Sequence, residues 1–177
     1  MKNKPSPILY PIIFLLFLTN ILAGIEISGE LKQWHKITLT IDGPFARETD
    51  TEPNPFTDYR MVVEFKHESG SSIYNIPGYF AADGNSANTS SDSGNKWRAH
   101  FSPDKPGKWF YKVSFVKGKL VALDNDLSGE PFKGCDGLNS SFEIGQTDKT
   151  GRDLRGKGRL NYVGKRSFNL PKLASIF

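Results

Sequence analysis

The chain has 177 residues, of which 37% are hydrophobic and 24% charged, with 23 basic and 19 acidic side chains. This composition is typical of a soluble globular protein with one domain and short flanking segments. The chain is too short for a complete eight-stranded α/β barrel, which needs about 250 residues. Its single cysteine excludes an internal disulfide and a metal cluster held by cysteines alone.

Residues 1–24 have the three parts of a secretory signal peptide. Lys2 and Lys4 supply a positive start, residues 8–23 are almost entirely apolar, and Ala23 and Gly24 end the run with small side chains. The apolar run is shorter than the roughly 20 residues that span a bilayer. The alternative is a retained N-terminal anchor. We expect an exported protein, periplasmic, extracellular or at the cell surface, with no membrane contact after the signal is cleaved.

Charge is distributed unevenly along the chain. Residues 24–148 carry 13 basic and 18 acidic side chains, whereas residues 149–177 carry 8 basic side chains and only Asp153 as an acid. A basic tail is one feature of nucleic-acid-binding proteins. An exported protein seldom meets nucleic acid, so we expect a solvated basic linker over residues 148–177, glycine-rich and poorly packed, and no nucleic-acid partner.

The region between signal and tail, residues 25–147, shows the period-two alternation of short strands. Such alternation, with β-branched and aromatic residues on one side, predicts strands that bury one face. The clearest strands are expected at residues 37–41, 59–66, 97–101 and 109–115, and shorter ones at 26–32, 72–76, 120–123 and 140–144. Asp42-Gly43-Pro44 is expected to end the first of the clear strands. Seven or eight short antiparallel strands favour an all-β, immunoglobulin-like β-sandwich.

Motifs of catalysis are scarce. The sequence has no Gly-x-Ser-x-Gly elbow, no phosphate-binding glycine loop and no His-Glu-x-x-His. Asp83, Asn85, Asn88 and Asp92 offer oxygen ligands for calcium, but their spacing matches no calcium loop, and a plain polar loop is the default. We therefore expect no catalytic residue, metal or cofactor. Two alternatives stay open: a small glycan-active enzyme using an Asp/Glu pair, and a cell-surface adhesion module.

A series of short sequence motifs gives the chain a family resemblance. In chain order, the motifs are Gln33-Trp-His-Lys36, Ile41-Asp-Gly-Pro44, Pro53-Asn-Pro-Phe-Thr-Asp-Tyr-Arg60, Pro77-Gly-Tyr-Phe-Ala-Ala-Asp-Gly84, Gly94-Asn-Lys-Trp97, Phe101-Ser-Pro-Asp104, Gly151-Arg-Asp153, Gly158-Arg-Leu160 and Tyr162-Val-Gly-Lys165. From about Ile25 to Lys165 the chain resembles domain-of-unknown-function family 5060, an immunoglobulin-like domain at the N-terminus of proteins regarded as exported bacterial glycoside hydrolases.

The resemblance implies an accessory role beside a catalytic α/β barrel. The family's stretch like residues 151–165 leads into that barrel, and here the match fades after Lys165, so we expect a truncated form or fragment without the catalytic domain. Polysaccharide is the other expected partner. The segment 77–84 is the expected contact surface, where Tyr79 and Phe80 supply aromatic area and Asp83 accepts hydrogen bonds.

Two arginines on expected strands complete the candidate contact residues. Arg60 and Arg98 are expected either to pair with carboxylates across an interdomain face or to be solvated strand positions. For the aromatic pair, the alternative is that Tyr79 and Phe80 cap the core behind a turn at Pro77-Gly78.

Overall fold

The computed structural model describes residues 24–162, 164, 168 and 169. All but the last residue of the expected signal peptide, and the C-terminal end of the expected linker, lie outside this range. The strands are β1 (Ile25–Gly29), β2 (Ile37–Arg47), β3 (Tyr59–His67), β4 (Ile73–Pro77), β5 (Tyr79–Phe80), β6 (Ser93–Phe101), β7 (Gly107–Lys117), β8 (Glu130–Pro131), β9 (Asn139–Ile144), β10 (Asn161–Tyr162) and β11 (Phe168–Asn169). The helical turns are α1 (Ser86–Thr89) and the 3-10 turn η1 (Leu154–Gly156).

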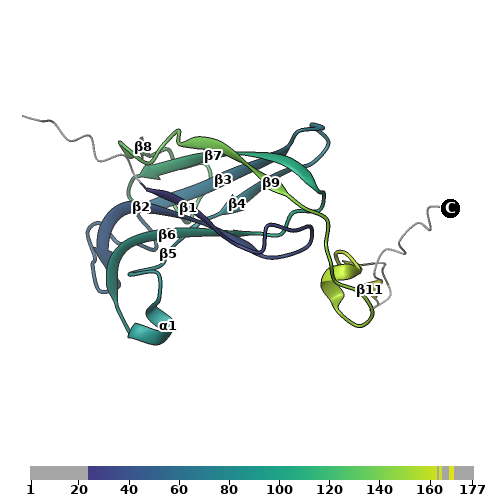
Figure 1. The fold of residues 1–177 in the computed structure, drawn as a ribbon. Coiled ribbons are helices and arrows are strands. Elements are labelled where there is room, and N and C mark those ends of the chain that lie inside the picture. The colour runs from purple at the N-terminus through teal and green to yellow at the C-terminus, as the bar shows by residue number, and fades with distance from the viewer. Residues whose placement is uncertain (1–23, 163, 165–167, 170–177) are drawn as a thin grey trace, which may run out of the picture.

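Two antiparallel sheets stack face to face (Figure 1). The first sheet has the strand order β1-β2-β6-β5, and in the second β4, β3 and β7 lie in order, with β8 and β9 both pairing with β7. This arrangement confirms the expected all-β, immunoglobulin-like sandwich. The helical turn α1 projects from the β5–β6 side, and the segment after β9 leaves from the other end of the sandwich (Figure 1).

The core is formed by the alternating side chains of β2, β3, β6 and β7, as the sequence predicts. Rings from one sheet meet rings from the other: Phe65 stacks on Phe101 with centroids 4.4 Å apart, and Trp97 and Phe115 meet edge to face at 5.0 Å. Aromatic pairs of this kind contribute about 0.5–1.5 kcal/mol beyond the burial of their surface. The interior is therefore filled by side chains and leaves the binding surfaces to the loops and sheet exteriors.

The expected end of a strand at Asp42-Gly43-Pro44 is wrong. β2 continues to Arg47, and its pairing with β6 shifts register between Asp42 and Ala46, which makes an irregularity of the β-bulge type. Gly43 permits this because its backbone runs against the Trp97 ring, where an added Cβ would lie 2.4 Å from Cδ1. The Trp97 indole also donates to the Pro44 carbonyl at 3.1 Å.

The short strand expected at residues 120–123 is wrong as well. This segment is a turn in which Leu120 has a positive φ of 56°, and Val121 is completely buried. Asp58 holds the turn, since its carboxylate accepts the amides of Leu120 and Asn54, both at 2.9 Å. These hydrogen bonds, the Leu120 amide first, lower the pKa of Asp58. Apolar side chains alone do not distinguish a buried turn from a strand.

The expected basic linker is held to one end of the sandwich. Past Ile144, the described part of the chain contains no buried side chain, which confirms the expectation of poor packing. We name residues 148–160 the tail segment. Its turn η1 is capped by Asp153, whose carboxylate accepts the Arg155 amide at 3.0 Å. Gly156 lets η1 approach Lys149 closely, because an added Cβ would lie 2.1 Å from the Lys149 carbonyl oxygen.

Candidate functional site

Three of the five predicted contact residues line one hollow at the open edge of the sandwich. Arg60, Tyr79 and Phe80 all border a hollow of about 210 Å³ between β3, β5 and the neighbouring loops. Phe56 and Asn125 border it from those loops. We name these five residues the β5 surface. Phe56 is not among the contact residues predicted from the sequence, although an aromatic residue that follows two prolines and precedes a strand is a signal for an exposed ring.

Tyr79 lies at the outer edge of the β5 surface and is 43% exposed. Its hydroxyl is 2.8 Å from Nε2 of His100, and Nδ1 of that imidazole is 2.9 Å from the Thr38 hydroxyl. Burial, assisted by nearby cations, lowers the pKa of His100, so the neutral ring bridges the two hydroxyls near neutral pH. The chain of hydrogen bonds holds the Tyr79 ring in one position while part of it stays accessible.

Phe80 faces the other way. Its side chain is only 7% exposed and contacts Trp97 at 5.3 Å and Phe56 at 6.2 Å between ring centroids. Phe56 is 52% exposed and extends this aromatic row to the surface. The two aromatics predicted together are thus divided between core and surface, and Phe56 with Tyr79 provides the accessible ring area.

Arg60 has a role that the sequence did not indicate. Its guanidinium donates to three backbone carbonyls of the loop after β7: Val121 at 3.1 Å, Asp124 at 3.0 Å and Leu127 at 3.1 Å. These contacts within the chain are additional to the expected alternatives, a carboxylate across an interdomain face or a solvated strand position. Arg60 fixes the loop that forms one wall of the β5 surface, and its part in contacts with another molecule stays a prediction.

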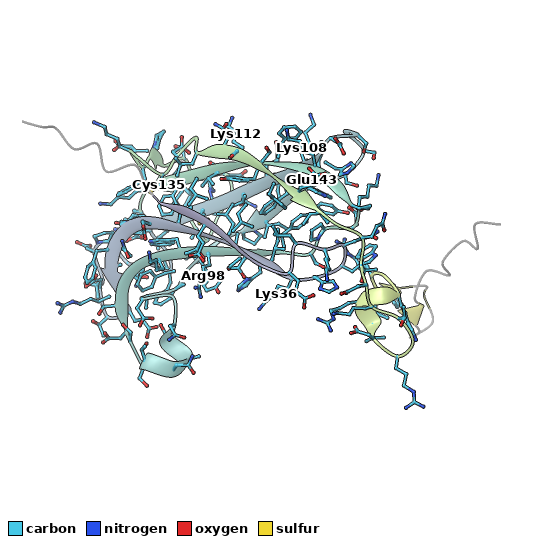
Figure 2. All side chains as sticks on the ribbon, in the orientation of Figure 1. Lys36, Arg98, Lys108, Lys112, Cys135 and Glu143 are labelled. Atoms are coloured by element: carbon cyan, nitrogen blue, oxygen red, sulfur yellow. The ribbon has the colours of Figure 1, made fainter. Side chains whose placement is uncertain are left out.

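Asp83 and Arg98 lie off the hollow. The Asp83 carboxylate accepts from the Thr89 hydroxyl at 2.6 Å and from the Asn85 amide at 2.7 Å, which orders the loop around α1 and lowers the pKa of Asp83. Arg98 lies on the outer side of β6, where its Nε donates to the Thr40 hydroxyl at 3.2 Å (Figure 2). Arg98 pairs in register with Tyr79, so a ligand that extends from Tyr79 along this sheet meets Arg98 next.

A cluster of charges joins the tail segment to the loop after β1. The Glu30 carboxylate lies 3.6 Å from both Lys149 and Arg155 and 3.1 Å from Nδ1 of buried His35, and Asp148 lies 2.6 Å from Lys32. Glu30, His35 and Asp148 present ligand atoms within 4.8 Å of one another. The ammonium groups already neutralise these carboxylates, which favours an ion-pair contact over a site for a divalent cation.

A second and larger hollow lies between the tail segment and Trp34, and sequence reasoning missed it. The hollow measures about 660 Å³. Its lining is Gln33, Trp34, Gln146, Thr147, Lys149, Thr150, Gly151, Gly156, Lys157 and Gly158. We name it the Trp34 groove. A smaller hollow of about 350 Å³ shares Trp34 and Gly158 with it. The available signal in the sequence was a tryptophan in a loop outside every strand pattern.

Cys135 is an inert group in this arrangement. It is buried, and burial raises the pKa of its thiol to about 11. The thiol is therefore protonated near neutral pH. Within the described ranges, no helix is both long and apolar enough to cross a membrane.

Two comparisons with known proteins gave a match. Residues 30–116 match the model of DUF5060, a family described as a domain of unknown function, and this range contains all five predicted contact residues and Trp34. A crystal structure titled as a putative glycoside hydrolase from Bacteroides vulgatus ATCC 8482 is similar at 18% identity and a TM-score of 0.49. The similarity covers 81% of this chain and 20% of that one, so this chain spans about a fifth of that protein. The comparison with curated proteins found no match. Over residues 30–116, just under half of its length, this chain is therefore similar to the DUF5060 family.

Proposed function

We propose that this protein is a non-catalytic accessory module of an exported glycoside hydrolase, and that its β5 surface contacts glycan. The observation that carries the proposal is the pair of accessible rings, Phe56 and Tyr79, beside a hollow in an otherwise filled sandwich. Exposed aromatic area next to a hollow is typical of recognition surfaces. A sugar ring offers an apolar C–H face to such rings and hydroxyl groups to the polar atoms around them.

The use of the carboxylates supports a binding role over a hydrolytic one. Hydrolysis of a glycosidic bond requires two carboxyl groups that face a sugar across a cleft, one of them able to give up a proton. Asp58 lines a further hollow of about 360 Å³ between residues 51–58 and 117–120, but its carboxylate accepts backbone amides, and the carboxylate of Asp83 accepts hydrogen bonds within the loop around α1. Both groups have lowered pKa values, which opposes a role as general acid.

A packing role beside a catalytic barrel is the second candidate, and a separate observation favours it. Leu154 and Leu160 in the tail segment are 57% and 55% exposed, and Tyr162 just beyond it is 68% exposed. Apolar side chains gathered at one end of a small domain fit an interdomain contact of moderate area. The two roles use opposite ends of the sandwich and are compatible with each other.

The test of the glycan role is retention of the full chain on insoluble polysaccharides and in polysaccharide-containing native gels. We expect retention on at least one polymer and a loss of about tenfold or more in affinity for Phe56→Ala combined with Tyr79→Ala. Phe110→Ala is the matched control, because Phe110 is 44% exposed on the outer face of the other sheet. Tyr79→Phe keeps the ring and removes the hydroxyl next to His100.

A parallel assay for release of reducing ends tests the non-catalytic part. We expect no release above the blank. Hydrolysis that disappears on replacing one carboxylate would show a small enzyme instead, and retention unchanged by the double variant would remove the β5 surface from the proposal.

A further inference from the structure

The Trp34 groove is a second candidate ligand site, and its volume is larger than that of the hollow at the β5 surface. Its volume of about 660 Å³ lies in the range of small-molecule sites, about 300–1,000 Å³. One wall is an indole and the others carry amide, hydroxyl and ammonium groups, from Gln33, Gln146, Thr150 and Lys157. A flat aromatic surface with several hydrogen-bonding groups is a combination that sugars can use.

The position of Trp34 is fixed by the backbone. Trp34 has a φ of 65°, a left-handed conformation that is unusual for a bulky side chain and requires support from its surroundings. Its amide donates to the Pro103 carbonyl at 2.8 Å, and the preceding amide of Gln33 donates to Gly145 at 2.9 Å. Both loops that flank the groove therefore hold the indole in place before any ligand binds.

The charge around the groove is positive. Residues 30–35 of the loop after β1 and the tail segment together contribute six cationic and three anionic side chains. The cations are Lys32, Lys149, Arg152, Arg155, Lys157 and Arg159, and the anions are Glu30, Asp148 and Asp153. No carboxylate lines the groove or the smaller hollow beside it. Three positive charges remain uncompensated and attract an anion.

Lys157 is the cation best placed to meet a ligand. Lys149, Arg155 and Lys32 all lie within 4.0 Å of a carboxylate, whereas Lys157 lines the groove and has no ion-pair or hydrogen-bond partner for its side chain among the described residues. An ammonium group without such a partner can pair with a carboxylate or sulfate group of a ligand. Gly151 and Gly158, with positive φ and no side chain, leave backbone groups accessible beside it.

We infer that the Trp34 groove binds an anionic oligosaccharide, whose sugar ring stacks on Trp34 and whose carboxylate or sulfate group meets Lys157. This inference rests on the proposed function, since it names the class of glycan that the accessory module takes. It places the anionic part of the ligand at the tail end of the sandwich, away from the β5 surface.

The test is titration of the full chain, followed by calorimetry and by tryptophan fluorescence, with three probes. An oligogalacturonate carries carboxylates, a carrageenan oligosaccharide carries sulfates, and a cello-oligosaccharide of the same length is neutral. We expect binding of one or both anionic probes, at least about tenfold weaker binding of the neutral one, and an affinity that falls as salt is raised. The anionic probe that binds shows whether the groove takes a carboxylate or a sulfate group.

Variants locate the site. Trp34→Ala is expected to weaken binding about tenfold or more, and Lys157→Glu to weaken it several-fold and to reduce its salt dependence. Trp34→Phe, which keeps a stacking ring, should recover part of the loss if the ring itself contacts the sugar. Lys133→Glu is the matched charge reversal, because Lys133 is exposed and lies two residues before Cys135, which is at the other end of the sandwich from the tail segment (Figure 2). Unchanged thermal unfolding and circular dichroism of Lys157→Glu exclude loss of the fold.

Each outcome decides the inference without deciding the proposed function. Equal binding of neutral and anionic probes, binding unaffected by both Trp34→Ala and Lys157→Glu, or no binding of any probe would each overturn it. A glycan role at the β5 surface is then still measured by the Phe56 and Tyr79 variants. Loss of binding in those variants alone would support the β5 surface and reject the Trp34 groove.

Discussion

The sandwich body and the tail segment are held in place by different forces. In the body, rings from the two sheets pack against one another, and side chains such as Trp97 and Trp109 are at most 1% exposed. In the tail segment no described side chain is buried, and its contacts to the body are ion pairs centred on Glu30 and Asp148, together with Arg159, which lies 5.1 Å from the centroid of the Tyr74 ring. The body therefore keeps its structure as long as the chain is folded, whereas salt and pH can change the position of the tail segment.

This difference separates two kinds of candidate surface. The β5 surface lies between strands of the body, so its rings keep their geometry as long as the sandwich is folded. The Trp34 groove has one wall in the body and the other in the tail segment, so its shape depends on exposed ion pairs, which salt and pH weaken. A ligand that bridges both walls would in turn stabilise the tail segment.

The largest expected effect is in the body. Trp97→Ala removes a ring that contacts Phe115, Phe80 and Tyr59. It also removes the donor to Pro44 and leaves a cavity behind the bulge of β2. We expect the free energy of unfolding to fall by about 3–5 kcal/mol, measured by denaturant titration. Trp97→Phe should cost less, and a loss below about 1 kcal/mol for the alanine variant would show that the sheets do not depend on this ring.

Replacing Arg60 tests whether the loop that forms one wall of the β5 surface is held firmly to the sandwich body. Arg60→Met keeps most of the side-chain volume and removes three hydrogen bonds to the loop that contains Val121, Asp124 and Leu127. We expect a loss of about 1–3 kcal/mol in the free energy of unfolding, together with faster hydrogen exchange in that loop. Arg98→Met is the control, because Arg98 makes one side-chain hydrogen bond, to Thr40. Equal effects of the two variants would contradict a special role of Arg60.

Glu30 tests the attachment of the tail segment. Glu30→Gln removes the negative charge that faces Lys149 and Arg155 and leaves the core untouched. Because exposed ion pairs contribute little, we expect the free energy of unfolding to change by less than about 1 kcal/mol. Cleavage by trypsin after Lys149, Arg155 or Lys157 should nevertheless become several-fold faster. Glu143→Gln is the control on β9, and an unchanged cleavage rate for Glu30→Gln would show that other contacts hold the tail segment.

The fold was predictable to the extent that it depends on alternation. The buried positions of β3, β6 and β7 follow from apolar residues at every second position, and this pattern is visible without a structure. The continuation of β2 past Gly43 was not visible, because glycine and proline usually mark a turn, and only the approach of Trp97 explains their place inside a strand. For residues 120–123, the decisive contact comes from Asp58, distant in the sequence.

The candidate sites were predictable to a smaller extent. The segment 77–84 was found from its aromatics, but only the structure divides Phe80 from Tyr79 and adds Phe56 to the hollow. The Trp34 groove was missed because its two walls are more than 100 residues apart in the chain and meet only when β9 brings the tail segment beside the loop after β1. The spacing of residues in the sequence does not show that the loop after β1 and the tail segment lie side by side in the fold.

The final prediction concerns pH and the tail segment alone. The hydrogen bond from Lys32 holds the pKa of Asp148 far below its usual value, and Arg155 lowers the pKa of Asp153 to about 2. A carboxyl group with a lowered pKa in the folded state stabilises that state above its unfolded pKa, near 4, and the contribution is lost as pH falls through the folded pKa. The contact of Asp148 with the body and the Asp153 cap of η1 should therefore both persist from neutral pH to about pH 4 and weaken progressively as pH falls below it, which loosens the tail segment.

Hydrogen exchange measured by mass spectrometry on residues 148–157 and on β6, over this pH range and corrected for the intrinsic rate, checks the prediction. Protection of the tail segment should fall while that of β6 falls less, because the contacts of β6 with the core are apolar. Asp153→Asn should remove part of the pH dependence by removing one titrating group. Equal loss of protection in both segments would mean that the tail segment and the sandwich unfold as one unit, and the contrast between packed rings and exposed ion pairs would then not govern their behaviour.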